Sequence, residues 1–295
     1  MIKRTIYALG FFDGVHLGHQ ALLRSCRELA DQHDCEAVAV TFTAHPDALV
    51  FGKAPGLLNT NKDRISLLCA YGMDSVLEIP FDRALMTTHW SSFLKQLVDS
   101  GAAGFVCGSD FRFGADSRGT AKKLAAFCKS RQLCWAVVPE QTMDGERISS
   151  TRIRRFLEQG DLAQVNRLLG HPYILTGPVV SGQQLGRTIG IPTANLQLPE
   201  ELIPPRLGVY ACKCLVDGRE YLAVTNVGTR PTVNGSNISV EVHLLDFEGN
   251  LYGKPLTVAF CQFLRPEKKF PSLEELQKEI QKNTLQTRKF FEKSI

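Results

Sequence analysis

The sequence predicts an α/β half built on a parallel sheet, followed by a small antiparallel β-barrel and a terminal helix. Short apolar strand candidates alternate with helical patterns before Thr151, and strand candidates follow one another closely after Tyr173. The chain has 295 residues, of which 44% are hydrophobic, so it is long enough to bury two separate cores. We therefore expect two domains, each with its own chemistry.

The first half contains five strand candidates that are rich in apolar or β-branched residues. They cover residues 5–9, 37–42, 75–79, 104–108 and 133–139. Between them, apolar side chains recur at helical spacing in residues 21–30, 65–70, 93–98 and 124–128. Strands that alternate with helices favour a parallel sheet covered by helices.

The pattern changes in residues 152–169, which are typical of one or two helices. We expect an interruption near Gly160, with Asp161 as the N-cap of a second helix that ends at Gly170. The predicted division is a first domain over residues 1–158, a linking helical region over residues 159–172 and a second domain over residues 173–295.

The second half contains strand candidates at close spacing. They cover residues 173–180, 208–216, 220–227, 239–246 and 256–263. An antiparallel barrel closes such a set without leaving open edges. Ser272 and Glu275 form a capping box that begins a final helix, whose buried face we predict at Leu273, Leu276 and Ile280.

Composition narrows the function classes. The net charge is only +4 and the basic residues are dispersed, so no nucleic-acid partner is expected and small anionic ligands are favoured. No run approaches ~18 apolar residues and no secretion leader is present, so no membrane partner is expected. Nine scattered cysteines favour reduced thiols and a cytoplasmic location. The sequence does not predict the oligomeric state.

A glycine-punctuated segment, residues 10–19, follows the first strand candidate. Glycines there let backbone amides approach phosphate oxygens, and the next helix directs its positive end to the same place. His16 and His19 can both face the bound phosphates, and their ordinary pKa near ~6.5 makes them readily cationic. The alternative is that the histidines merely cap a helix. The predicted phosphate-binding residues of this loop are Gly10, Phe12, Asp13 and Gly18.

A second element, residues 147–154, places hydroxyls and then guanidiniums at the start of a helix. Arg147, Ser150, Thr151 and Arg154 are suited to hold a leaving pyrophosphate, although a capped helix with a solvated basic face is the alternative. Together with the histidine pair, this element resembles the nucleotidyltransferase superfamily, which releases pyrophosphate. In such an enzyme the acceptor's own phosphate attacks the α-phosphorus of ATP, so catalysis is positioning and charge neutralisation.

The acceptor is expected at residues 108–114, where an apolar strand ends in a glycine-rich loop. Asp110 is flanked by aromatic residues, and Phe111 and Phe113 can wall a planar ring. Aromatic residues at alternate positions are equally ordinary in the core at a strand end, so both interpretations stay open.

A second glycine-spaced loop lies past the middle of the chain, at Gly182, Gly186 and Gly190. Thr193 and Asn195 follow it at alternate positions, so their hydroxyl and amide oxygens can share one Mg²⁺ with ATP phosphates. This pattern predicts a second nucleotide site.

Residues 240–247 alternate strictly between apolar and polar side chains. Glu241, His243 and Leu245 therefore share one face of a strand, and Glu241 is a candidate base toward a substrate hydroxyl. A simply solvated glutamate is the alternative.

Taken together, the chain resembles the bacterial bifunctional riboflavin kinases/FAD synthetases nearly end to end. The resemblance rests on the two phosphate motifs and on residues 108–114, 148–154, 208–211, 225–232, 240–247, 251–253, 264–266 and 269–270. It implies a Rossmann-like nucleotidyltransferase domain that adenylylates FMN to FAD, followed by a riboflavin kinase-like barrel that phosphorylates riboflavin. ATP and Mg²⁺ would serve both steps. The family often shows Pro-His-Pro where this chain has Ala44-His45-Pro46, which bears on the flavin wall.

The resemblance also implies roles for the candidate residues. His16 and His19 would stabilise the adenylyl transition state, and Asp110 would help to place FMN or the nucleotide. Thr193 and Asn195 would bind the magnesium nucleotide, with Glu241 as the kinase base. Arg265, with the loop around it, would close over the flavin.

The sequence leaves two other functions open. One is a nucleotidyltransferase with a different phosphate acceptor, which the Pro-Thr-Ala-Asn segment and the Glu241 strand disfavour. The other is a flavin-responsive regulator with one inactive site, which the complete set of candidate side chains disfavours.

Overall fold

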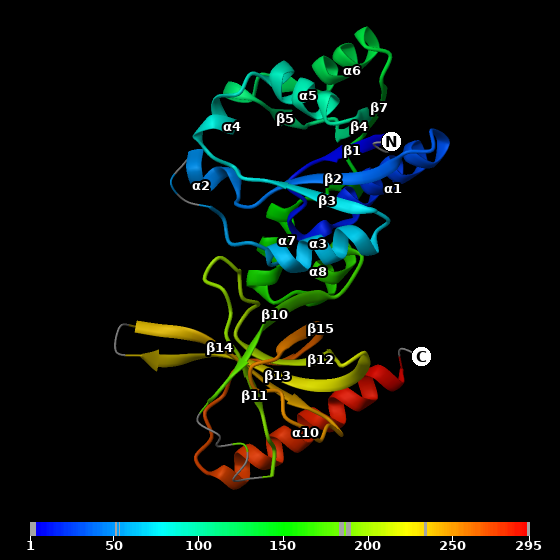
Figure 1. The fold of residues 1–295 in the computed structure, drawn as a ribbon. Helices are drawn as coiled ribbons and strands as arrows, with labels where there is room; N and C mark the ends of the chain where they lie inside the picture. Colours follow the sequence, from blue (N-terminus) through cyan, green and yellow to red (C-terminus); the bar gives the residue numbers. More distant parts are fainter. Residues whose placement is uncertain are drawn as a thin grey trace. The chain divides into compact units, whose positions relative to one another are not determined.

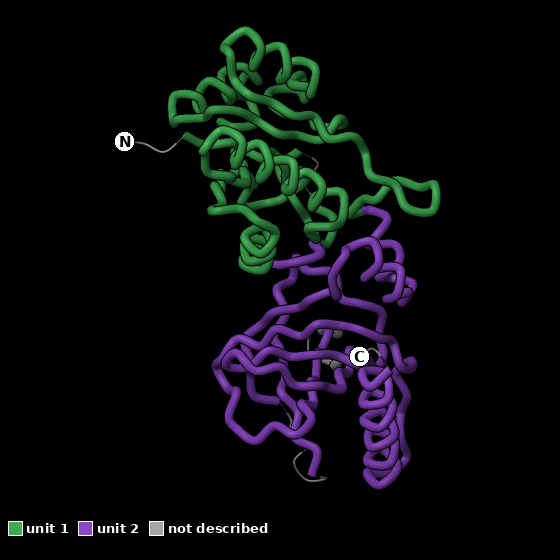
Figure 2. Tube along the Cα trace, turned by 90° about the vertical axis from the view of Figure 1, so that its right-hand side faces the viewer, with its two compact units in different colours: residues 1–56, 61–150 green, residues 57–60, 151–295 purple. Residues whose placement is uncertain are grey.

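The computed structural model describes residues 4–50, 52, 54–182, 186, 190–232 and 235–293, without the side chains of residues 230–232 and 235–237. The chain divides into two compact units, drawn in different colours in Figure 2. Unit 1 comprises Met1–Gly56 and Asn61–Ser150, and unit 2 comprises Leu57–Thr60 and Thr151–Ile295. The domain limits predicted at residues 158 and 172 stay a prediction.

Unit 1 is built on a sheet of five parallel strands in the order β3-β2-β1-β4-β7. The strands are β1 (Thr5–Leu9), β2 (Glu36–Phe42), β3 (Ser75–Ile79), β4 (Ala102–Gly108) and β7 (Cys134–Val138). The predicted parallel sheet is thus confirmed, with each strand within two residues of its expected position.

Helices cover both faces of this sheet, as Figure 1 shows. Side chains of successive strand residues point to opposite faces, so Ile6 packs with α1 (Leu17–Gln32) and α3 (Asn61–Ala70), whereas Tyr7 packs with α5 (Trp90–Asp99) and α6 (Ala121–Ser130). The shorter elements are α2 (Pro46–Val50), α4 (Arg83–Thr87), η1 (Asp13–Val15), η2 (Ala115–Ser117), β5 (Arg112–Phe113), β6 (Gly119–Thr120), β8 (Thr142–Met143) and β9 (Glu146–Arg147).

The strand order determines where a ligand can bind. The chain runs outward from β1 through β2 to β3 and then returns to the other side of β1 with β4. In open α/β sheets, ligands bind beyond the carboxyl ends of the strands, where the strand order reverses. That point lies between β1 and β4, directly before Gly10 and at Gly108. Both predicted loops of the first site therefore begin there.

The main segment of unit 2 begins at Thr151, within the first of two helices, α7 (Ser150–Gln159) and α8 (Leu162–Leu169). Gly160 has a left-handed φ of 80°, and the side chain of Asp161 accepts a hydrogen bond from the amide of Gln164 at 3.1 Å. Gly170 ends α8 with a φ of 74°. The predicted break and caps are confirmed.

The rest of unit 2 is a closed barrel with the strand order β10-β11-β14-β13-β12-β15, in which β10 also pairs with β15. The strands are β10 (Tyr173–Val180), β11 (Ala194–Leu196), β12 (Gly208–Val216), β13 (Arg219–Thr232), β14 (Gly235–Leu244) and β15 (Pro255–Arg265). The predicted antiparallel barrel is confirmed. Strand β11 was not predicted, because its three residues are too few for alternation to be visible.

The terminal helix α10 (Leu273–Glu292) packs on β12 and β13. The hydroxyl of Ser272 accepts a hydrogen bond from the amide of Glu275 at 3.3 Å, so the predicted start is confirmed. Leu273 is 46% exposed, and its assignment to the buried face is wrong. The fully buried residues of the helix are Asn283 and Thr287, because the contact with the barrel involves its second half.

Candidate active sites

The first candidate site begins with the loop after β1. Phe12, Gly14 and Val15 have left-handed backbone angles, with φ of 60°, 77° and 42°. A side chain on Gly10 would approach the Phe12 ring to 2.9 Å, so the tight turn requires glycine there. The Phe12 side chain is 1% exposed and anchors the loop in the core. Phe12, a predicted phosphate-binding residue, can therefore offer only its backbone to a phosphate.

His16 and His19 lie at the N-terminus of α1. The Nδ1 atom of His16 accepts a hydrogen bond from the backbone amide of His19 at 3.3 Å, and the two rings stack at 3.7 Å. Because Nδ1 accepts, the proton of a neutral His16 ring is on Nε2, which can donate to a ligand. A side chain on Gly18 would come within 3.1 Å of the His16 ring, so glycine leaves room for it. His16 is thus a helix cap and remains a candidate donor.

The pKa of His19 differs from the value expected from the sequence. Burial is the main cause that lowers its pKa well below the ordinary value, and the charges of His16, Arg147 and Arg64 act in the same direction. The expectation that both imidazoles are readily cationic is therefore wrong for His19 in the ligand-free protein. Its ring packs edge-on against Phe12, with centroids 5.3 Å apart.

Two contacts bring distant parts of the sequence to this loop within unit 1. The Ser150 hydroxyl donates to the carbonyl oxygen of Asp13 at 2.9 Å, which ties the first residue of α7 to η1. Arg147 forms an ion pair with Asp110 and a second one with Glu140 at 3.1 Å. The predicted phosphate ligand Arg147 and the predicted flavin contact Asp110 are therefore partners of each other.

The remaining predicted residues of this site are two aromatic residues of the acceptor loop and two polar residues of α7. Phe113 is 7% exposed and packs against Phe93 in the core, so its ring cannot wall a ligand without moving. Phe111 stacks on Phe113 with centroids 5.4 Å apart and is only partly buried. Thr151 and Arg154 belong to unit 2. Their phosphate-binding role stays a prediction.

The second candidate site lies on the outer face of the barrel. Glu241 of β14 is directly opposite Asn195 of β11 on one side and Asn226 of β13 on the other. Directly opposed residues of antiparallel strands share a face. The flanking residues Val240 and Val242 are fully buried, which directs Glu241 outward. A carboxylate therefore stands in a row between two amide side chains.

The loop before β11 is shaped around this row. A side chain on Gly182 would come within 2.2 Å of the Asn195 amide nitrogen, so the backbone at Gly182 packs directly on that amide. A side chain on Gly186 would come within 2.2 Å of the Ile191 carbonyl oxygen and would lie 3.5 Å from the Thr193 hydroxyl, and Gly190 has a left-handed φ of 70°. The Nδ1 atom of His243 lies 2.9 Å from the carbonyl oxygen of Pro192. The strand register thus places Glu241 beside Asn195, and Thr193 precedes Asn195 by two residues. Their role in binding a magnesium nucleotide stays a prediction.

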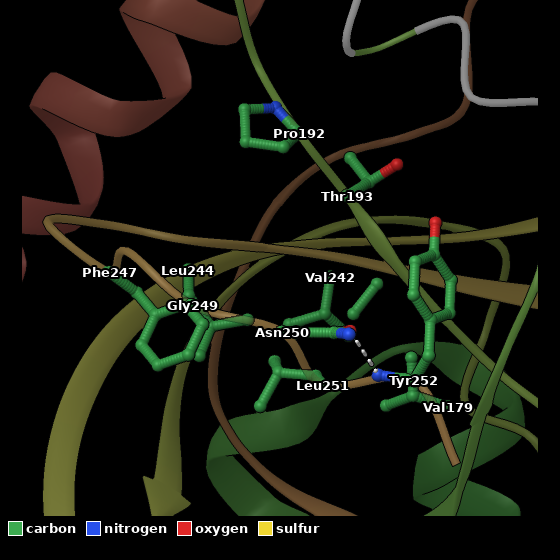
Figure 3. A pocket seen from close by; sticks show the side chains of 11 residues that line it. Val179, Pro192, Thr193, Val242, Leu244, Phe247, Gly249, Asn250, Leu251 and Tyr252 are labelled. Atoms are coloured by element: carbon green, nitrogen blue, oxygen red, sulfur yellow. Dashed lines mark hydrogen bonds between the residues drawn. The ribbon is translucent and has the colours of Figure 1, made fainter. Parts of the chain in front are cut away.

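A pocket with about 500 Å³ of empty space, open to solvent, lies beside this loop. Apolar side chains dominate its lining: Val179, Val242, Leu244, Phe247 and Leu251. Figure 3 shows the hydroxyl groups of Thr193 and Tyr252 on one side of the pocket. An apolar pocket with hydroxyls at its edge is suited to a planar ring that carries a polar chain.

Arg265 of β15 lies in the same outer row, opposite Val209. Its Nε donates to the side-chain oxygen of Asn283 at 3.1 Å, and Glu279 lies 3.5 Å away. Burial lowers the pKa of Arg265, and Glu279 opposes that shift. Arg265 is thus bound to two residues of α10. The predicted closure over a flavin stays a prediction.

Comparison with protein families assigns each half of the chain to a separate family model. Residues 2–152 match the family model for FAD synthetase, and residues 169–291 match the model for riboflavin kinase. A bifunctional riboflavin kinase/FMN adenylyltransferase from Haemophilus influenzae is 39% identical over 99% of this chain and 96% of its own length. The protein of that name from Listeria monocytogenes is 35% identical over 98% and 93%, respectively.

The chain belongs to the bifunctional riboflavin kinase/FMN adenylyltransferase family. The crystal structure of a macrolide-efflux protein from Streptococcus pneumoniae has a TM-score of 0.87 and 29% sequence identity, over 98% of this chain and 95% of that one. The whole chain therefore shares the fold of that protein. Among the described residues, no helix has the length and apolar character needed to cross a membrane.

Two side chains at these sites were missed by the sequence analysis. Asn226 lies in a motif that supports the family resemblance, but only the strand register places it beside Glu241. Arg64 lies in an unremarkable helical segment and is 1% exposed in the structure. Arg64 directly follows Asn61, Lys62 and Asp63 in the sequence, so the local pattern indicates a solvated arginine.

The neutral state of His19 leads to a prediction. Since the folded state disfavours the charged ring, the unfolded chain binds the additional proton, and stability falls as the pH drops below about 6.5. We expect ¹⁵N NMR of the imidazole to show a neutral His19 at about pH 6 in the ligand-free protein. His16→Asn should raise the pKa of His19, because one of the lowering charges is removed. A ring already protonated near pH 7 would contradict this assignment.

Proposed function

We propose that the two activities of this family are carried by the two sites described above. The outer row of the barrel, with Glu241 as base, phosphorylates riboflavin to FMN. The loop at the β1–β4 switch point, with His16 and His19, adenylylates FMN to FAD. The observation that carries the proposal is that each unit contains its own glycine-shaped loop beside the candidate catalytic side chains.

In the kinase step, the carboxylate of Glu241 accepts the proton of the ribityl 5′-hydroxyl. The hydroxyl oxygen then bonds to the γ-phosphorus of ATP, the bond from that phosphorus to the β-bridging oxygen breaks, and ADP leaves. Asn195 and Asn226, on either side of Glu241, can orient the hydroxyl by hydrogen bonding.

The residues present are suited to Mg²⁺. Thr193 and Asn195 offer hydroxyl and amide oxygens, and the tight packing of Gly182 on Asn195 holds the amide in place. A bound Mg²⁺ would neutralise charge on the ATP phosphates. The apolar pocket beside Thr193 is of a kind that accepts a purine ring, and Thr193 is both a lining residue of this pocket and a candidate magnesium ligand.

In the adenylyl step, a phosphate oxygen of FMN attacks the α-phosphorus of ATP. The bond from that phosphorus to the bridging oxygen breaks and pyrophosphate leaves, so no protein nucleophile is needed. Backbone amides of the loop and the N-terminus of α1 face the phosphates, and Nε2 of His16 donates to the developing charge. Arg147 and Ser150, which belong to unit 1, would hold the pyrophosphate.

Incubation of the purified chain with riboflavin, ATP and Mg²⁺, followed by chromatography of the flavins over time, tests this function. We expect FMN to appear first and FAD to follow. With FMN supplied, FAD and pyrophosphate should form without riboflavin. A protein that converts neither flavin would contradict the proposal.

The packing of Gly182 gives a further prediction for the kinase site. Gly182→Ala should lower FMN formation by about tenfold or more, because the added methyl displaces the Asn195 amide. The measurement is the KM for ATP and the kcat of FMN formation. Gly218→Ala is the control, since an added methyl there meets open space, and it should leave the kinetics of FMN formation unchanged. Equal losses in the two variants would contradict a specific effect on the Asn195 amide.

A further inference from the structure

Arg64 is an almost fully buried cation in unit 1. It lies on α3, which packs against η1, and it is 1% exposed. One terminal nitrogen donates to the carbonyl oxygen of Phe42 at 2.8 Å and also contacts the side-chain oxygen of Asn61. The other terminal nitrogen and Nε are buried and have no hydrogen-bond partner among the described residues. Leaving donors of a buried guanidinium unused is unfavourable, so this arrangement requires an explanation.

The surroundings of Arg64 direct its charge to the phosphate loop. The guanidinium carbon lies 4.3 Å from the centroid of the Phe11 ring, and the Thr41 hydroxyl donates to the Phe11 carbonyl oxygen at 2.8 Å. Arg64 interacts electrostatically with Asp13 and with His19, which lie on either side of the turn. Arg64 therefore lies directly behind the loop that we assign to the substrate phosphates.

The charges around Arg64 are incompletely balanced in the ligand-free protein. Asp13 and Glu78 favour its charged form, and Glu78 also accepts a hydrogen bond from Asn61. Burial opposes the charge more strongly than these two carboxylates support it, and the pKa of Arg64 is lowered. An anionic ligand in the loop would add the missing counter-charge across a short distance of low dielectric.

We propose that Arg64 is a positioning residue of the adenylyltransferase site, a fixed positive charge behind the glycine loop that draws the phosphate groups of ATP and pyrophosphate into it. This proposal rests on the proposed function of unit 1. Arg64 does not itself touch the reacting atoms, and it neither gains nor loses a proton during the reaction.

A purely structural role for Arg64 has different consequences. If Arg64 only supports the loop, a neutral substitution destabilises the ligand-free protein. Arg64→Lys then forms FAD no faster than Arg64→Met, whose side chain has a similar length. If its charge attracts phosphate, Arg64→Met leaves the ligand-free protein as stable or more stable, because an incompletely paired buried charge is removed. Arg64→Lys then retains function, because it keeps the charge.

The experiment compares the wild type with Arg64→Lys, Arg64→Met and Arg64→Gln in the full-length chain. Magnesium pyrophosphate is the binding probe, and FAD formation from supplied FMN is the activity. We expect the Kd of pyrophosphate and the KM for ATP to rise about tenfold in the Met and Gln variants and to stay within about threefold in Lys. FMN formation from riboflavin, measured in the same samples, should be unchanged.

Two results would overturn the proposal. One is an equal loss of pyrophosphate affinity in Arg64→Lys and Arg64→Met, and the other is an unchanged Kd of pyrophosphate in both neutral variants. Two neutral variants that fail to fold would also count against it, because a supporting role then accounts for Arg64. The wild-type control separates this question from the proposed function. If the wild type forms no FAD from FMN, the assignment of unit 1 fails, whatever the variants do.

Discussion

Glu241→Gln is expected to lower the rate of FMN formation from riboflavin by about 10²- to 10⁴-fold, the contribution typical of a positioned general base. Glutamine preserves the volume of the side chain and its position between Asn195 and Asn226, so the strand register should be retained. Only the capacity to accept the proton is lost. Steady-state kinetics with riboflavin and ATP give the size of the effect.

The same variant should form FAD from supplied FMN at the wild-type rate, because Glu241 lies in unit 2 and the loop after β1 lies in unit 1. Glu248→Gln, at an exposed turn position of the barrel, is the matched control and should leave both activities unchanged. A Glu241→Gln enzyme that still forms FMN within about tenfold of the wild type would remove Glu241 from the role of base.

His16→Asn is expected to lower FAD formation from FMN by about 10²- to 10³-fold, the usual effect of losing one donor to a developing charge. Asparagine is itself a favoured N-cap, so α1 keeps its cap while the imidazole is lost. The loss should fall mainly on kcat, since the donor acts most strongly on the transition state.

His89→Asn provides an unusually close control for this prediction. His89 also caps a helix with its side chain, at the start of α5, and has no part in the proposed chemistry. Its substitution should change neither activity. If His16→Asn and His89→Asn lowered FAD formation to the same degree, helix capping rather than phosphate stabilisation would explain why FAD formation requires His16.

Much of the fold could be predicted because its signals are local. The strands of unit 1 are short, mainly apolar runs between helical patterns, and the caps at Asp161 and Ser272 are set by residues three positions away. Strand β11 could not be predicted, because its pairing with β10 and β14, rather than its own three residues, makes it a strand. Leu273 had the right spacing for a buried face but lies outside the buried part of α10.

The candidate sites were predictable to the extent that each motif is contiguous. The histidine pair and the Thr193–Asn195 pair depend only on neighbouring residues. The partnership of Asp110 with Arg147 joins residues 37 positions apart, and the row through Asn226 depends on strand register. The low pKa of His19 and the buried charge of Arg64 arise from packing around α1 and α3, which local spacing does not reveal.

The central claim is that each unit performs one reaction, and a mixing experiment tests it most directly. The Glu241→Gln and His16→Asn proteins are each incubated with riboflavin, ATP and Mg²⁺, alone and in equal mixture, and the flavins are separated. We predict that the first protein leaves riboflavin unchanged, the second stops at FMN, and the mixture forms FAD. A mixture that forms no FAD, or a His16→Asn protein that makes no FMN, would contradict the division of the two reactions between the two units.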